Sequence, residues 1–450
     1  MGKVRKAFYR VSVLCIAVLI SSASFATIGL AQSVGTLDQR REQLFSSMLS
    51  DPANLDLAFE YAALSVQAGD LEGAISTLER MLIFSPGLPR LQLELGVLYY
   101  RLGSYDSAHS YFQAVLDRPD VPPEVIENVR LYEVAIEKAG APQRFSGVAV
   151  LGTRYQTNAN LAPLNREINL NGLPFLLNPA NTAQPDFNVY GALNLHYTHD
   201  LQSQGDLFEA DLTLYGAGYA DLDNLNILLG ELTAGPVFNM NRFGIPNTLM
   251  GVYGIINGIN VGGDFYSHGA GGGVRLVSRP NFRTSINLKA EVRQRWYENS
   301  VARPLNSDRD GVQFKGIMDL DYLLNSKWTL LARLHGDTEQ TNRDYHDHWE
   351  AGGSVGLRRA FQSPLPTLPG TWSVTGRTGI AFRDYGGPDP TINPTLTQHD
   401  REFFVSGGLV APIKDNFSWF LDSEFRVVDS NYDTSDLNNF SVSTGIIKRF

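Results

Sequence analysis

The chain changes its hydrophobic period once, near residue 144. From about residue 37 to 140, apolar residues recur at helical spacing. From Arg144 onward, apolar and polar residues alternate with a period of two, in about 14 segments of roughly 10 or more residues. The pattern therefore predicts an all-α part over residues 37–140, followed by an all-β part over residues 145–450.

The helical part contains an internal repeat. Three pairs of residues lie 34 positions apart, namely Gly69 and Gly103, Ala74 and Ala108, and Leu78 and Phe112. The second unit reads Leu95-Gly96-x-x-Tyr99 and then Ala108-x-x-x-Phe112, which is similar to the tetratricopeptide repeat signature, a pair of antiparallel helices. In that register we expect Gly96 to let the two helices approach, and Asp70 and Ser104 to cap the second helix of each pair.

The repeat register also predicts a concave face. Its lining residues would be Phe59, Ala63, Arg90, Leu93, Val97, Tyr100 and Arg101. Two interpretations stay open at this point, a helical spacer or a surface that holds a peptide or protein.

The alternating segments are long and numerous enough to cross a membrane as tilted strands. We expect them near residues 145–155, 187–200, 206–219, 228–239, 247–258, 266–277, 282–297, 311–324, 327–337, 348–360, 370–384, 401–412, 416–428 and 438–450. Most odd-numbered connections are long and polar, such as 156–186 and 338–347, whereas most even-numbered ones are short turns, such as 278–281. Short turns at one end and long loops at the other are typical of an outer-membrane β-barrel with both termini in the periplasm.

The polar face of these strands would line the barrel. It carries charges of both signs: Glu209, Asp211, Lys289, Glu291, Arg293, Lys315, Asp319, Asp321, Arg333, Arg377, Asp422, Glu424 and Arg426. A balanced lumen fits either a neutral hydrated passage or a wall whose charges pair. Asp319 and Asp321 share a face only because the strand period forces it, so we predict no catalytic residues and no enzyme.

The first residues resemble a secretory signal peptide. Lys3, Arg5, Lys6 and Arg10 precede an apolar run, and a small-residue cleavage site follows at Ala31 or at Ala26. We therefore expect residues 1–31 to be removed. Cys15, the only cysteine, lies in that run, so the mature chain would have neither disulfides nor thiolate metal sites.

Charge and loop composition limit the remaining chemistry. The formal net charge of −10 at pH 7, without a basic stripe, makes nucleic acid an unexpected partner. Asp344-Tyr-His346-Asp-His348 concentrates metal-ligating side chains in a loop but lacks recognisable ligand spacing, so we predict no metal and no cofactor.

The final segment has one apolar face. Phe440, Val442, Ile446 and Phe450 lie on it, opposite Ser441 and Ser443. This segment resembles the C-terminal assembly signal of bacterial outer-membrane proteins, which is read by the barrel-assembly machinery.

The combination of signal peptide, short repeat array and barrel resembles the surface lipoprotein assembly modulator (Slam) family. The stretches 91–108 and 122–132, and the barrel entry Tyr155-Gln-Thr-Asn-Ala-Asn160, carry the resemblance. It implies a Gram-negative outer-membrane translocon among outer-membrane lipids. The repeats would receive a client protein or lipoprotein, or a periplasmic chaperone, and the barrel would deliver the client to the cell surface. Two alternatives stay open, an outer-membrane porin for exopolysaccharide export and a passive barrel that tethers envelope components.

Overall fold

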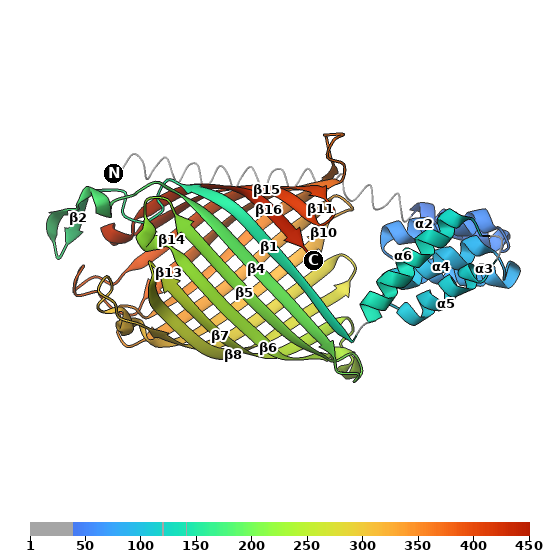
Figure 1. The fold of residues 1–450 in the computed structure, drawn as a ribbon, viewed down its shortest axis with the longest axis horizontal. Coiled ribbons are helices and arrows are strands. Elements are labelled where there is room, and N and C mark those ends of the chain that lie inside the picture. Colours follow the sequence, from blue (N-terminus) through green and yellow to red (C-terminus); the bar gives the residue numbers. More distant parts are fainter. Residues whose placement is uncertain (1–38, 119–120, 141) are drawn as a thin grey trace. The chain divides into compact units, whose positions relative to one another are not determined.

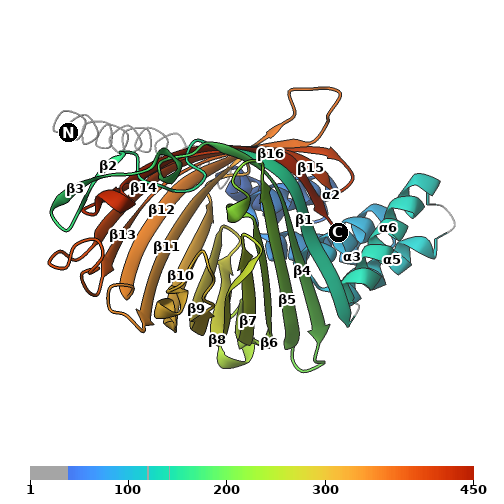
Figure 2. The same ribbon diagram turned by 60° about the vertical axis from the view of Figure 1, so that its left-hand side comes forward.

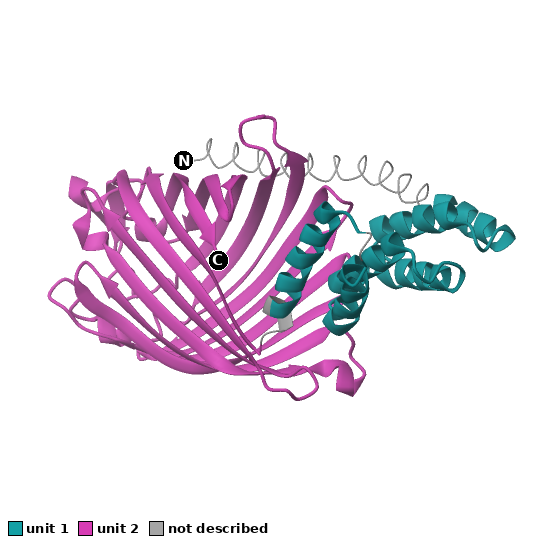
Figure 3. Ribbon diagram, turned by 45° about the vertical axis from the view of Figure 1, so that its right-hand side comes forward, with its two compact units in different colours: residues 1–141 teal, residues 142–450 magenta. Residues whose placement is uncertain are grey.

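The computed structural model describes residues 39–118, 121–140 and 142–450, and the predicted signal peptide lies outside them. The chain divides into two compact units, residues 1–141 and residues 142–450 (Figure 3). The first unit is helical and the second is a β-barrel, as the change of period predicts.

Six helices make up the described part of the first unit. They are residues 39–50, α2 (Leu55–Ala68), α3 (Leu71–Phe84), α4 (Pro89–Leu102), α5 (Tyr105–Leu116) and α6 (Pro123–Gly140) (Figure 1). None of the described helices is long and apolar enough to cross a membrane.

The ends of the helices follow the repeat. Gly69 and Gly103 end α2 and α4 with φ angles of 83° and 82°, a left-handed conformation that favours glycine. Asp70 caps α3, because its carboxylate accepts a hydrogen bond from the Gly73 amide at 2.8 Å. The capping prediction is only partly right for Ser104, whose hydroxyl donates to the Ser107 hydroxyl at 3.0 Å instead of accepting from a backbone amide.

A close contact joins α4 to α5. Gly96 is buried, and a Cβ atom placed on it would lie 2.5 Å from Cε1 of Phe112. Phe112 is fully buried and stacks on Tyr132 of α6, with ring centroids 5.1 Å apart. The small residue at position 96 therefore makes room for the ring that joins three helices.

Fourteen antiparallel strands in the described second unit close into a barrel, with β1 beside both β16 and β4 (Figure 2). They are β1 (Gln143–Gln156), β4 (Asp186–Asp200), β5 (Leu207–Tyr219), β6 (Ile227–Asn239), β7 (Thr248–Val261), β8 (Asp264–Asn281), β9 (Thr284–Tyr297), β10 (Gly311–Leu323), β11 (Trp328–Thr341), β12 (His348–Gln362), β13 (Thr371–Tyr385), β14 (His399–Lys414), β15 (Phe417–Ser430) and β16 (Leu437–Arg449). Two short strands, β2 (Glu167–Leu170) and β3 (Leu173–Leu176), form a hairpin in the first long loop.

Every predicted strand segment corresponds to one barrel strand, but three connections differ. The connection predicted at 259–265 is shorter, because β7 continues to Val261 and β8 begins at Asp264. The turn predicted at 278–281 is wrong, because β8 continues to Asn281 and the turn falls at residues 282–283. A register shift between Ser278 and Asn281 accommodates Pro280, which cannot donate to a regular ladder. The loop predicted at 338–347 is shorter, because β11 continues to Thr341.

The two faces of the barrel wall differ in polarity. Exposed apolar side chains such as Leu151, Leu334 and Ile446 lie on the outward face. The five tryptophans stand near strand ends on that face, Trp296 and Trp349 toward the long loops and Trp328, Trp372 and Trp419 toward the short turns. Two aromatic girdles around an apolar band are the outer surface expected of a membrane barrel.

The last strand also has its apolar residues outside. Phe440, Val442, Ile446 and Phe450 share the outward face with Leu151 and Tyr155 of β1. Phe450 and Gly147 exchange backbone hydrogen bonds of 2.8 and 3.1 Å, so the final residue is bonded to the first strand.

Candidate functional site

Apolar residues form a column on the face of the helical unit that the repeat register predicts to be concave. Ala63, Val97 and Leu131 occupy the same repeat position at successive 34-residue steps, on α2, α4 and α6. Tyr100 and Val134 form a second, parallel series. Leu131 and Val134 are 65% and 63% exposed, which is high for adjacent large apolar side chains on one helix face.

The predicted concave residues fall into three groups. Arg90 lies over the ring of Phe59, with its guanidinium carbon 4.2 Å from the ring centroid. Leu93, Val97 and Tyr100 are half-buried against the cluster formed by α5 and α6. Tyr100 there contacts the ring of Tyr132 at 5.4 Å. Ala63 and Arg101 are exposed.

The sequence prediction of this face omits α6. Leu131 and Val134 are the 34-residue equivalents of Val97 and Tyr100, so the same step would have found them. The repeat signature is weak in α6, because Arg130 occupies the position that Gly96 occupies in α4.

A tyrosine pair links α4 and α5 to α3. The Tyr99 hydroxyl donates to Glu79 at 2.6 Å, and the Tyr111 hydroxyl donates to the same carboxylate oxygen at 3.3 Å. The hydrogen bond to Glu79 and burial raise the pKa of Tyr99 to about 12. Burial and Glu79 also raise the pKa of Tyr111. The Tyr99 hydroxyl therefore stays protonated above the pH range in which free tyrosine ionises, and the shift of Tyr111 has the same direction.

The second candidate site is the inner wall of the barrel. The strand register places all thirteen predicted lumen residues on the inward face. Among these residues, the structure pairs Arg293 with Glu291 at 2.7 Å, Arg333 with Asp319 at 2.6 Å, and Arg426 with Glu424 at 3.0 Å.

Other predicted wall residues pair with partners that the prediction did not include. Glu209 bonds Arg275, and Asp211 bonds His196 at 2.7 Å. The wall holds further ion pairs between strands, such as Arg295 of β9 with Glu339 of β11 at 3.1 Å, across β10. These partners also lie on the inward, polar face of the alternating strands, so the same alternation could have identified them as wall residues.

Five predicted wall residues form no ion pair among the residues that the structure describes. They are Lys289, Lys315, Asp321, Arg377 and Asp422. The remaining wall charges are mostly neutralised by a neighbour within hydrogen-bond distance, so the wall has paired charges of both signs.

One network crosses three strands. Arg293 of β9 reaches Glu231 of β6 at 2.5 Å while it also bonds Glu291, which accepts a hydrogen bond from Tyr253 at 2.8 Å. The inward positions of β8 next to Arg293 are glycines, including Gly271, where an added Cβ atom would collide with the backbone of β9. The glycines of the segment 269–273 thus leave the inner wall of β8 without side chains, and the Arg293 side chain extends over it.

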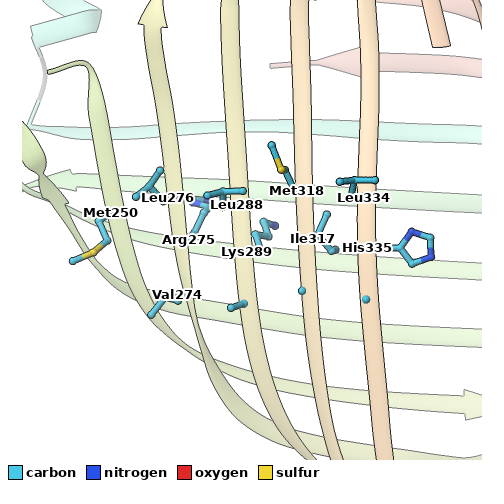
Figure 4. A pocket seen from close by; sticks show the side chains of 13 residues that line it. Met250, Val274, Arg275, Leu276, Leu288, Lys289, Ile317, Met318, Leu334 and His335 are labelled. Atoms are coloured by element: carbon cyan, nitrogen blue, oxygen red, sulfur yellow. The ribbon is translucent and has the colours of Figure 1, made fainter. Parts of the chain in front are cut away.

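The outward face has its own hollow of about 520 Å³ (Figure 4). Gly316 and Gly336 pair across β10 and β11, while Leu288, Met318 and Leu334 border them. Because these outward positions alternate with lumen residues, the hollow belongs to the apolar outer surface.

The loop with possible metal ligands is held by hydrogen bonds instead. Asp347 accepts from the Thr341 amide at 2.6 Å, and His348 lies 3.4 Å from Asp337. Among the described residues, no group of three or more His, Cys, Asp or Glu side chains could hold a metal ion. Burial and the nearby Arg309 lower the pKa of His346, which favours its neutral form.

Comparison with known proteins finds similarities to each of the two parts of the chain. Residues 65–125 match the tetratricopeptide repeat family. No protein with curated function matches the chain. A tetratricopeptide repeat protein from Parabacteroides merdae ATCC 43184 is similar at 22% identity and a TM-score of 0.22, over 24% of this chain and 41% of its own length.

Two outer-membrane proteins are similar to the barrel. The COG4313 outer-membrane channel of Pseudomonas putida F1 aligns with 69% of this chain and 98% of its own, at 11% identity and a TM-score of 0.37. The outer-membrane channel DcaP of Acinetobacter baumannii aligns with 70% and 98%, at 10% identity and a TM-score of 0.37. The chain combines a tetratricopeptide repeat region with a closed 14-strand barrel similar to outer-membrane channels.

Proposed function

We propose that the chain is an outer-membrane translocon, which receives a client protein or lipoprotein in the periplasm and delivers it to the cell surface. The helical repeats would bind the client or its chaperone, and the barrel would conduct the client or assist its folding. The observation that carries this proposal is the apolar column of the concave face, joined on one chain to a membrane barrel.

The build of the barrel supports the outer-membrane location. An apolar outward band between two tryptophan girdles matches a bilayer, and a closed barrel leaves no strand edge unpaired in lipid. The first strand begins and the last strand ends on the short-turn side of the barrel, where Gly147 and Phe450 exchange backbone hydrogen bonds. In outer-membrane barrels that side faces the periplasm, so the repeats would work there.

The chemistry of the concave face supports a polypeptide partner. Leu131 and Val134 expose apolar surface that would be removed from water when an apolar helix or extended segment binds. Arg90 and Arg101 flank the column with positive charge, which would favour acidic residues beside the apolar anchors of the client.

The test is the surface proteome of cells that express the full chain or a variant. Leu131→Asp with Val134→Asp should remove specific client proteins from the surface and raise their periplasmic levels. Both side chains are exposed, so folding should be little affected. Ile83→Asp is the matched control, because Ile83 is a 78% exposed apolar residue on α3, away from the concave face.

Protease shaving with mass spectrometry would measure the result. If the surface proteome is the same in the Leu131→Asp, Val134→Asp variant, the Ile83→Asp control and the wild type, the client-receiving role is rejected. Loss of an exported polysaccharide without loss of any surface protein would favour the exporter alternative.

A further inference from the structure

The inner wall holds one polar pocket of about 590 Å³, on strands β13–β16, β1 and β4. Its floor consists of two adjacent inward rows that follow the strand register. One row runs Arg377, Ser406, Glu424, Ser441 and Gln156, and the other runs Thr375, Gly408, Asp422, Ser443 and Arg154. The rows span five strands, or roughly 19 Å at the usual strand spacing.

Two charged side chains of this pocket have no partner of opposite charge within hydrogen-bond distance among the described residues. Arg377 forms no ion pair with any described residue, and Asp422 accepts no hydrogen bond from one. Arg154 donates to Ser443 at 3.0 Å and lies over the ring of Tyr190, at 4.8 Å from its centroid. The pocket therefore offers donors and acceptors that the fold leaves available.

The arrangement of charge selects the class of ligand. An anion beside Arg377 would also meet Asp422 and Glu424, and a cation beside those carboxylates would meet three guanidinium groups, including that of Arg426. A hydroxyl group both donates and accepts, so it satisfies either kind of neighbour without a net charge. Serines and glycines in the floor leave space above it for the units of a hydroxyl-bearing chain.

We propose that this pocket is a binding subsite for a neutral, hydroxyl-rich chain, namely an oligosaccharide. The subsite leads from the middle of β13 to the long-loop end of β1, where Leu161 of the first long loop borders it. This inference is independent of the client proposed for the helical repeats, because it uses only lumen residues. An oligosaccharide subsite would give the barrel a substrate class that is separate from the client of the repeats. It is also a feature that an exopolysaccharide exporter would need.

The test is calorimetric titration of the full chain with maltoheptaose, in a detergent without a sugar headgroup. Saturable binding is expected, and Arg377→Gln or Asp422→Asn should each weaken it by about tenfold, the usual loss for a hydrogen bond to a charged group. Lys315→Gln is the matched control, because Lys315 is an inward cation outside the pocket that also lacks an ion pair with described residues. It should leave the affinity unchanged.

Two further measurements keep the outcome decisive. Ser441→Phe should block the floor and abolish binding, while heat-modifiable migration in gels confirms that each variant still forms a barrel. Absence of saturable binding, equal affinity in all variants, or tighter binding of an oligogalacturonate or of a neutral Gly-Ser peptide would overturn the proposal.

Discussion

The contact between Gly96 and Phe112 allows a prediction in which the effect of one substitution on the free energy of unfolding changes sign with the residue at position 112. A Cβ atom at position 96 would lie 2.5 Å from the Phe112 ring, so Gly96→Ala overfills the interface between α4 and α5. Overpacking typically costs about 1–3 kcal/mol, while replacing a helical glycine by alanine gains about 1 kcal/mol. We expect the free energy of unfolding of the helical unit to fall by about 1 kcal/mol.

The same substitution should stabilise the unit once the ring is gone. In a Phe112→Leu background the clash is removed, and Gly96→Ala should raise the free energy of unfolding by about 1 kcal/mol. The coupling between the two positions is then about 2 kcal/mol, within the range measured for residues in contact.

Two spectroscopic signals separate the units of the full chain. All five tryptophans lie in barrel strands, so their fluorescence reports the barrel, whereas far-ultraviolet circular dichroism at the helical band reports the repeats. Urea unfolding in detergent would give the four free energies, with an unchanged fluorescence transition as the control. An equal effect of Gly96→Ala in both backgrounds would refute the packing argument.

Three further predictions concern other parts of the chain. The pKa of Tyr99 is about 12 in the folded unit and 10 when unfolded, so its stabilisation is complete below pH 10 and is lost toward pH 12. Glu79→Gln should reduce this loss in an alkaline titration followed by circular dichroism. Arg293→Met leaves Glu231 and Glu291 without their cation and should destabilise the barrel by about 3 kcal/mol in urea unfolding, whereas no change would mean that water screens the network. Gly271→Val should prevent formation of the heat-modifiable barrel, while Ser267→Val on the same inward face should be tolerated better.

The sequence predicts the barrel strands well for a physical reason. Lipid outside and polar contacts inside impose the two-residue period on almost every strand, so alternation alone locates them. Prolines and bulges have no such periodic signal. The sequence therefore predicts a turn at Pro280, although a register shift keeps it within β8.

The sites were harder to predict, because they depend on distances between strands and helices. Nothing in the local sequence shows that Arg293 reaches Glu231 three strands away, since that contact crosses the glycines of β8 and depends on the strand order. On α6, Arg130 and Glu133 replace the signature glycine and tyrosine, which hid the repeat position of Leu131. On α6 the 34-residue spacing holds although the signature residues differ.

The pairing of wall charges limits how the barrel can act. A lumen of one sign attracts oppositely charged polymers by its field, but here most charges are neutralised by a neighbour within the wall. Under the proposed function, capture would therefore depend on short-range contacts, at the apolar column on the helices and at the hydroxyl-lined pocket in the barrel. Raising the salt concentration should consequently have little effect on the amount of client that the full chain delivers to the surface. A steep fall of that amount with salt concentration would instead indicate capture by long-range electrostatic attraction.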